Sequence, residues 1–362
     1  MDTRGLTRLM PTAPHFTTRR KVLGGLATLP AWRHARAADG DLELSVAGFH
    51  GPFQKAFQAI VINSFERAMP GVRVTYRPII NSAQLLAALR LEREAPQIDV
   101  AIADVSVAIL AKQEGLTSIL REEEIPTLRD IPDWGRFDAM NGVAFSRDNL
   151  SLIYDSRVLT RPPESWRELG RPDLTDQIAM PVEDTRGVVL LPLLTRMAGG
   201  DYRQNIEPGL TLMRQFAPYV ATWNAQPDIY TLTLAQTIAL GVGWNGRGQM
   251  LARDNPDTLR AVVPSEGSVA QINTLNLTAP PQRTRLAQAF IEHALSPDVQ
   301  TAFANVAFYG PVNRQVVLSD ETSEAIFGRP ETARRELHLD WGFVSQHYNS
   351  WIRRIQREVI SG

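Results

Sequence analysis

Cysteine is absent from this chain of 362 residues, and lysine is scarce. Without a thiol the chain can form no disulfide, no thiolate metal site, no catalytic cysteine and no lipid anchor on cysteine. Three lysines stand against 35 arginines, which we interpret as the codon bias of a GC-rich genome. The fold must therefore be stabilised by its core, and a content of 44% hydrophobic residues suffices for two lobes of ordinary size.

Several motifs with a known catalytic mechanism are also missing. The sequence contains no Gly-x-Ser-x-Gly, no His-Glu-x-x-His and no Gly-x-x-x-x-Gly-Lys. Beyond residue 37 only four histidines remain, and no two are spaced to share a metal on one helix: His50, His293, His338 and His347. The sequence predicts a protein that is not an enzyme and that uses no metal and no cofactor.

Positive charge is scarce beyond the first 37 residues. The whole chain has 38 basic and 39 acidic residues, but seven basic residues and one acidic residue lie in 1–37. The remainder carries 31 basic and 38 acidic residues, a net charge of −7. Nucleic acids and anionic membranes need a basic footprint on their protein partners, so we expect neither as a partner.

Residues 17–38 have the pattern of an export signal. Arg19 and Arg20 precede an uncharged stretch, 22–32, and residues 35–37 form a small-x-small cleavage site. The paired arginines match the twin-arginine pattern, although general secretion is an alternative. The stretch is shorter than the roughly 20 apolar residues that span a bilayer. We therefore expect 1–37 to be a signal peptide and the mature protein to be periplasmic.

Strand-like and helical patterns alternate along the rest of the chain. Period-two or continuous apolar segments predict strands at 42–47, 72–76, 99–103, 144–154, 177–181, 240–244, 261–264 and 271–277. Apolar residues at helical spacing predict helices at 52–69, 83–93, 106–114, 188–197, 208–217 and 282–295. Residues 48–51 are expected to be a loop. The alternation favours βαβ units and the α/β class.

A set of segments resembles, in the same order, the solute-binding proteins of ABC transporters. The match is to the polyamine (spermidine/putrescine) type, extracellular solute-binding protein family 1-like. The segments are 99–104, 112–116, 165–169, 178–181, 243–247, 294–300, 309–313, 339–341 and 350–352. Single pieces are short, but together they cover essentially the whole mature chain.

The resemblance implies a two-lobed periplasmic binding protein of type II, each lobe a central mixed sheet flanked by helices. Lobe 1 is expected at 38–145 plus 272–311, and lobe 2 at 146–271 plus 312–362. Such a protein closes its lobes around a small solute and delivers it to the transmembrane subunits of an ABC permease. We expect it to act as a monomer.

The resemblance also implies site residues, taken position by position. Asp184 matches the carboxylate that holds an amine, and Trp244 and Tyr309 match the aromatic wall, with Trp223 as a further candidate. Crevice positions are expected to be occupied by Phe49, His50, Asp104 and Asn273. Two carboxylates of the family are replaced, one by Gly187 and one within 271–273.

These replacements affect the expected ligand. A dication without two of its counter-charges would be costly to bury, so spermidine and putrescine fit less well. A zwitterion that uses Asp184 together with Arg247 fits better, because an arginine binds a carboxylate through two parallel hydrogen bonds. The expected ligand is a small organic solute that contains an amine or is zwitterionic.

Other interpretations stay open at this point. Trp244 could be a core residue, Tyr309 could pack a hinge, Asp184 could cap a helix and Arg247 could lie on the surface. The same fold could bind ferric ion or another small anion, although iron favours paired tyrosines and Tyr309 has no adjacent tyrosine. A secreted enzyme is the remaining alternative.

Overall fold

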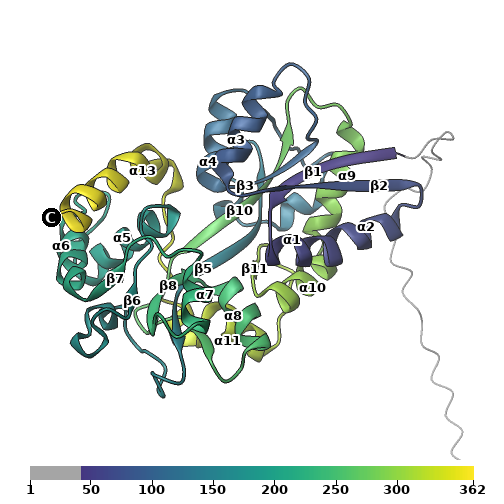
Figure 1. Ribbon diagram of the computed structural model, residues 1–362. Helices are drawn as coiled ribbons and strands as arrows, with labels where there is room; N and C mark the ends of the chain where they lie inside the picture. The colour runs from purple at the N-terminus through teal and green to yellow at the C-terminus, as the bar shows by residue number, and fades with distance from the viewer. Residues whose placement is uncertain (1–41) are drawn as a thin grey trace, which may run out of the picture. The chain divides into compact units, whose positions relative to one another are not determined.

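Figure 1 shows a computed structural model of the chain, which describes residues 42–362. The predicted signal peptide, 1–37, lies outside the described residues and stays a prediction. Within 42–362 no helix has both the length and the apolar character needed to cross a membrane.

The elements alternate between strands and helices. The principal strands are β1 (Leu42–Phe49), β2 (Val72–Ile79), β3 (Val100–Asp104), β5 (Val143–Asp155), β6 (Ile178–Ala179), β7 (Val220–Thr222), β8 (Leu240–Trp244), β9 (Leu259–Val262) and β10 (Ala270–Thr278); β4 (Thr117–Ser118) and β11 (Gly310–Pro311) are two-residue strands. The principal helices are α1 (Pro52–Phe57), α2 (Asn63–Ala68), α3 (Ser82–Leu91), α4 (Val105–Gln113), α5 (Thr185–Met197), α6 (Glu207–Phe216), α7 (Ile229–Leu234), α8 (Asn245–Asp254), α9 (Thr284–Leu295), α10 (Pro297–Ala307), α11 (Asp320–Phe327), α12 (Pro330–Ala333) and α13 (Trp341–Ile355).

The strands pair in the order β2-β1-β3-β10-β5-β8-β6-β7. On one side β1 runs parallel to β2 and β3, and on the other side β6 runs parallel to β7 and β8. We call β1–β3 the first sheet half and β6–β8 the second sheet half. The long strand β5 belongs to both, because its first part pairs with β10 and its last part pairs with β8 and β9. The sheet is mixed, as expected for the predicted α/β class.

The predicted elements are present, although β6 keeps only two of the five residues predicted at 177–181 and β9 begins two residues before the strand predicted at 261–264. Three further differences concern β1 and two helices. Strand β1 continues through Phe49, so residues 48 and 49 belong to the strand and not to the expected loop. The helix predicted over 52–69 is interrupted by a π-helical turn at Gln58–Ile62. The helix predicted from residue 188 begins earlier, at Thr185, because the Asp184 side chain caps it there.

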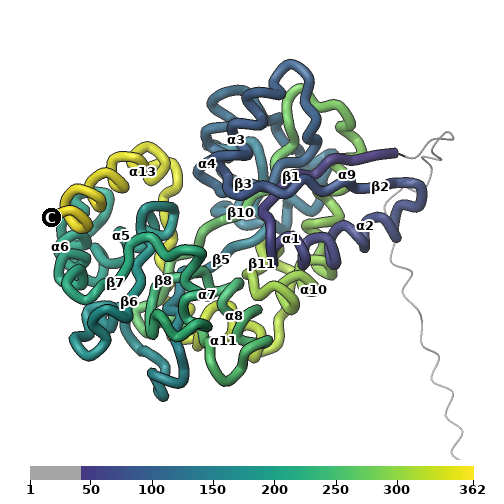
Figure 2. The backbone as a smooth tube through the Cα atoms, viewed as in Figure 1, coloured from purple at the N-terminus to yellow at the C-terminus, as the bar shows by residue number. Residues whose placement is uncertain are grey.

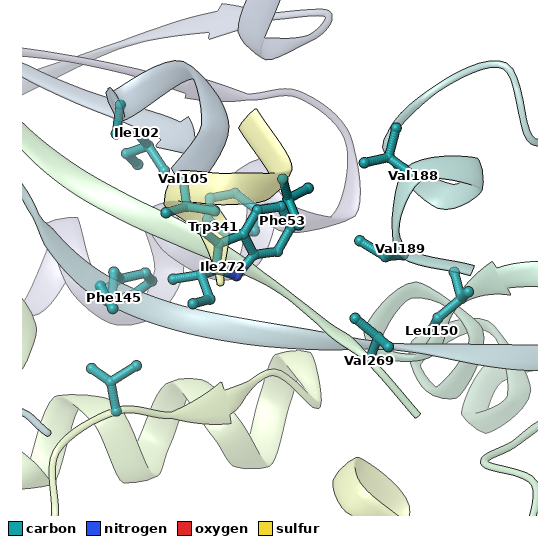
Figure 3. Packing of buried hydrophobic residues seen from close by; sticks show 14 of the residues in the cluster. Phe53, Ile102, Val105, Phe145, Leu150, Val188, Val189, Val269, Ile272 and Trp341 are labelled. Atoms are coloured by element: carbon teal, nitrogen blue, oxygen red, sulfur yellow. The ribbon is translucent and has the colours of Figure 1, made fainter. Parts of the chain in front are cut away.

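The core is continuous along both sheet halves. Strand β3 is buried along nearly its whole length, as its uninterrupted apolar run predicts. Figure 3 shows the packing at the middle of the sheet, where Ile272 on β10 lies beside Trp341 at the start of α13. Helix α13 lies beside the pair α5 and α6, from which it is distant in sequence (Figure 2). Trp166 is fully buried and Trp351 nearly so, and both are structural residues.

Candidate functional site

The carboxyl ends of the parallel strands place the candidate residues. Phe49 ends β1, Asp104 ends β3 and Trp244 ends β8. Asp184 follows β6, and Trp223 directly follows β7. In open α/β sheets ligands bind in the crevice outside the carboxyl ends of the strands, so each sheet half contributes residues to such an edge.

Asp104 is the candidate residue whose charge is least compensated. Its side chain accepts a hydrogen bond from the Gln271 amide, and its backbone N–H donates to Ser82 Oγ over 2.9 Å. Burial raises the pKa of Asp104 to about 7; a hydrogen bond with Ser82 opposes this, and the negative charge of Asp184 adds to it. Asp104 and Asp184 come from different sheet halves, and the effect of the Asp184 charge on Asp104 indicates that the two halves face one site.

Asp184 combines two of the roles that its sequence left open. Its Oδ1 accepts the Arg186 backbone N–H over 2.8 Å, which caps α5. The same carboxylate is paired with the Arg186 guanidinium, with 2.6 Å between Nη2 and Oδ2, and half of its side-chain surface is exposed. Asp184 is therefore a helix cap whose carboxylate also stays partly exposed.

Tyr348 on α13 joins this group. Its hydroxyl lies 3.1 Å from Thr185 Oγ1, next to Asp184 in sequence. Burial raises the pKa of Tyr348 to about 12, and the charges of Asp184 and Asp104 contribute to this increase. Helix α13 therefore supplies a phenol close to both carboxylates.

The Trp244 backbone is held by a buried tyrosine. Tyr230 Oη accepts the Trp244 N–H over 2.7 Å and donates to the Trp244 carbonyl over 2.8 Å. The Arg247 guanidinium carbon lies 4.7 Å from the centroid of the Tyr230 ring, and its Nη2 is 2.5 Å from Asp228 Oδ2. Arg247 is thus an ion-paired residue at the edge of the site and not a free surface arginine.

Tyr309 packs on the first turn of α8. A Cβ added to Gly246 would lie 2.7 Å from the Tyr309 ring, so only glycine permits this close approach. Asp148 Oδ1 accepts the Gly246 N–H over 2.8 Å. Burial raises the pKa of Asp148 to about 7, although hydrogen bonds from Gly246 and from the Tyr309 hydroxyl favour its charged form.

An aromatic chain links Tyr309 to the first sheet half. The Phe53 ring lies edge-on to both Phe49 and Tyr309, with centroids 5.5 Å apart in each case. Phe49 therefore belongs to the same wall as Tyr309. Asn273 is buried and donates to Ser146 Oγ over 3.2 Å, which places it under the site beside Gln271.

Two candidate residues stand apart from this group. The His50 side chain is exposed, and its backbone N–H donates to the Ile79 carbonyl. Trp223 is half-buried against the main core. Neither has a contact in the described structure that joins it to the carboxylates or aromatic residues above.

Comparison with known proteins decides the family. The profile of the family described as "Bacterial extracellular solute-binding protein" matches residues 61–327, most of the chain. The chain belongs to this family. The resemblance found in its sequence is thereby confirmed, and the relatives include spermidine/putrescine-binding periplasmic proteins.

The relatives of this solute-binding protein are distant. It is 23% identical over 235 residues to the gamma-aminobutyric acid-binding protein of Pseudomonas aeruginosa, covering 59% of this chain and 64% of that one. It is also 23% identical over 235 residues to a spermidine/putrescine-binding periplasmic protein of Haemophilus influenzae, with 62% and 64% coverage. The chain thus spans less than two thirds of the length of these relatives.

Solved structures agree on the fold. An ABC transporter substrate-binding protein from Bradyrhizobium japonicum superposes with a TM-score of 0.75 at 15% identity, covering 88% of this chain and 99% of that one. At this identity the match establishes the fold alone. The predicted two-lobed α/β architecture of a periplasmic binding protein is confirmed.

A glycine motif was missed in the sequence. Gly241, Gly243 and Gly246 form a Gly-x-Gly-x-x-Gly segment at a strand-to-helix turn, a spacing found in dinucleotide sites. Here Asp148 accepts the Gly246 N–H, so a buried carboxyl occupies the helix N-terminus where a phosphate would bind. The first two glycines pack against Ile229 and Ile153 instead.

Sequence reasoning also missed four polar residues of this solute-binding protein: Asp148, Arg186, Tyr230 and Tyr348. One signal was available for Asp148, because residues 146–149 are polar inside an otherwise apolar strand that is buried almost throughout. A polar residue in such a strand needs a partner or a function. Within 42–362, no three His, Cys, Asp or Glu side chains are grouped so that they could hold a metal ion.

Proposed function

We propose that this protein is the periplasmic substrate-binding component of an ABC transporter and that its solute contains an amine. The observation that carries the proposal is the proximity of Asp184 to Asp104, which comes from the opposite sheet half, and to Tyr348: the Asp184 charge acts on the pKa of both residues. Two carboxylates from two lobes, flanked by aromatic side chains, suit a ligand ammonium group around which the lobes close.

The charges of the site support a cationic group on the ligand. Four carboxylates, from Asp104, Asp148, Asp184 and Asp228, share the site with two guanidinium groups. Each guanidinium is already paired, Arg186 with Asp184 and Arg247 with Asp228. The described hydrogen bonds to the carboxyl groups of Asp104 and Asp148 come from neutral donors. A ligand ammonium would supply the missing positive charge.

A zwitterion places a further demand on the site. Its carboxylate would have to compete with Asp228 for Arg247, or with Asp184 for Arg186. The Asp228 carboxylate is the less accessible one, with 20% of its side-chain surface exposed against 50% for Asp184; burial acts to raise the pKa of Asp228, but the Thr231 N–H and the Arg247 charge outweigh it and lower the pKa. The pair of Asp184 and Arg186, whose carboxylate is half exposed, is therefore the one that a zwitterion would open.

A four-carbon series tests the ligand class. Putrescine is a dication, n-butylamine a monocation, γ-aminobutyrate a zwitterion and butyrate an anion, and all share one aliphatic body. The protein, without residues 1–37, is titrated with each by calorimetry, and its melting temperature is measured in parallel. We expect at least one amine-containing member to bind and to raise the melting temperature.

The pattern across the series decides between outcomes. Binding of γ-aminobutyrate without the two simple amines indicates a zwitterion site, and binding of either simple amine indicates a cation site. Binding of butyrate alone, or of none of the three amine-containing members, contradicts the proposed ligand class. Ferric ion in the same assay tests the alternative of an iron-binding protein.

The proposal extends to location, partner and lobe division. An exported receptor that binds without turnover would deliver its solute to permease subunits in the membrane. We place lobe 1 at 38–145 plus 272–311 and lobe 2 at 146–271 plus 312–362, joined by β5 and β10. Reconstitution with the permease and ATPase subunits would test delivery, since transport should depend on this protein.

A further inference from the structure

A cavity lies on the opposite face of β5 and β10 from the candidate site. Its floor is formed by Arg147 of β5 and by Ala270 and Ile272 of β10. Cross-strand partners share a face of the sheet, and Ile272 pairs with Arg147, whereas Gln271 pairs with Asp148 and Asn273 with Ser146. The cavity and the candidate site are therefore separated by the thickness of these two strands.

The walls of the cavity are mostly apolar and aromatic. Trp134 and Phe137 line one side, and Leu337, Leu339 and Trp341 line the other. The volume is about 220 Å³. Cavities for drug-sized ligands hold roughly 300–1,000 Å³, so this one fits a molecule about the size of a substituted benzene ring.

Arg147 brings one polar group to the floor with hydrogen-bonding capacity to spare. Its described hydrogen bonds all leave from Nη1, which donates to both carboxylate oxygens of Glu336 over 2.8 and 2.9 Å. Its guanidinium lies between two rings, 4.4 Å from the Phe327 centroid and 5.4 Å from the Trp134 centroid. Nε is buried and has no hydrogen-bond partner.

This arrangement indicates the ligand chemistry. Nη2 of Arg147 makes no described hydrogen bond and is not among the buried atoms, so it can donate a charge-assisted hydrogen bond to a carboxylate oxygen. The acidic rim residues Asp133 and Asp340 are exposed to solvent, so their repulsion of an anion is screened.

We propose that this cavity is a second ligand site and that it binds a small organic carboxylate with an apolar body. The carboxylate would accept a hydrogen bond from Nη2 of Arg147, and the apolar body would lie against Trp134, Phe137 and Trp341. The site does not depend on the function proposed above, because it shares no residue with the candidate site.

Three probes with one body test the proposal: phenylacetate, 2-phenylethanol and phenethylamine. Calorimetric titration of the whole mature protein should show binding of phenylacetate at least tenfold tighter than of the other two, since only a carboxylate accepts charge-assisted hydrogen bonds from arginine. Preferred binding of phenethylamine, or equal binding of all three, would overturn the proposed chemistry.

Two variants of cavity residues test whether phenylacetate binds in this cavity. Arg147→Lys keeps the positive charge beside Glu336 but removes the planar edge, so phenylacetate should bind about tenfold more weakly. Trp134→Ala, on the other wall, should weaken it as well. Arg167→Lys is the matched control, because Arg167 is exposed and does not line the cavity.

Two further measurements keep the result interpretable. The melting temperature of each variant shows whether it is folded. If the Arg147→Lys variant does not fold, Trp134→Ala gives an independent test. Putrescine and γ-aminobutyrate should not compete with phenylacetate. Competition, or unchanged phenylacetate binding in both cavity variants, would place the probe in the candidate site and refute the second site.

Discussion

The two faces of β5 and β10 differ in chemistry although they belong to the same two strands. On the front face, Asp148 lies opposite Gln271, and Ser146 lies opposite Asn273. On the back face, Arg147 lies opposite Ile272. On the front face Gln271 donates a hydrogen bond to Asp104, and Asp148 accepts one from the Gly246 N–H, whereas the back face supplies an apolar floor with one ion pair.

This difference shows how a strand at the junction of two lobes serves two purposes. Successive side chains of a strand point to opposite faces, so a polar residue at every second position builds a ligand site without disturbing the packing behind it. The crossover strands can therefore vary in solute specificity on one face while the other face keeps its packing. Four predictions test this separation, in order of decreasing expected effect.

The largest effect is expected on the back face. Ile272 is 6% exposed, and Ile272→Ala should lower the free energy of unfolding by about 2–5 kcal/mol, through lost burial and the cavity it leaves. Urea unfolding measures this change. Val317→Ala, at a position that is 85% exposed, is the control and should be nearly neutral. Solute affinity of the folded Ile272 variant should stay unchanged, and a large loss would show that the faces are coupled.

The next effect is expected on the front face. Asp104→Asn keeps the size of the side chain but removes the charge that faces the ligand ammonium. Affinity for the amine that binds in the four-carbon series should fall by about 30-fold or more. Asp133→Asn changes an exposed carboxylate of the back cavity and should leave this affinity unaltered. Equal losses in both variants would indicate a general electrostatic effect.

The affinity for an amine should change by about one order of magnitude between pH 6 and pH 8. Burial raises the pKa values of Asp104 and Asp148 to about 7, so these groups are mostly protonated at pH 6 and mostly ionised at pH 8. An ammonium binds the ionised form, so its affinity should rise about tenfold over this range per titrating carboxyl that it contacts. Asp104→Asn should reduce the slope, and a slope of opposite sign would contradict an amine ligand.

The same pKa shifts make the ligand-free protein less stable as the pH rises. A carboxyl whose pKa is raised by folding stabilises the folded state in its protonated form. This contribution is complete below the unfolded pKa near 4 and is lost as the pH rises through about 7. Added amine should therefore stabilise the protein more at pH 8 than at pH 6.

The smallest effect concerns the ion pair of Asp184 and Arg186 at the start of α5, whose carboxylate is half exposed. Arg186→Gln frees Asp184 from its partner. For a simple amine, affinity should increase by at most about fivefold, because Asp184 is half exposed and solvent screens its charge. For a zwitterion, the same variant should weaken binding, because Arg186 is the guanidinium that its carboxylate would reach. Calorimetry with n-butylamine and γ-aminobutyrate compares the two outcomes on one variant.

Much of the fold was predictable from local patterns. The continuous apolar run before Asp104 predicted a buried strand, and its end placed that carboxylate at the edge of the sheet. The position of Asp184 before a helical pattern allowed both a cap and a ligand contact, and the structure shows the cap. Such features depend on residues within one turn or one strand of each other.

The partners of the charged residues were not predictable in this way. Arg247 was considered as a clamp for a ligand carboxylate, but its neighbour Asp228 is supplied by the start of α7. Asp148 and Gly246 are 98 residues apart, and Asp104 and Gln271 are 167 apart. Phe49 joins the aromatic wall through Phe53, whereas His50, one residue later, points to solvent.

The sequence by itself determined the family, the α/β class and the strand ends at which a solute site can form. Its order of apolar and polar residues specifies each element, since hydrophobic periodicity acts over a few residues. Only the tertiary structure decided which carboxylates are paired with arginines, which lack a cationic partner, and where the cavity behind β5 and β10 lies. These features arise from non-local pairing of strands and helices, which sets the distances between charges that are far apart along the chain.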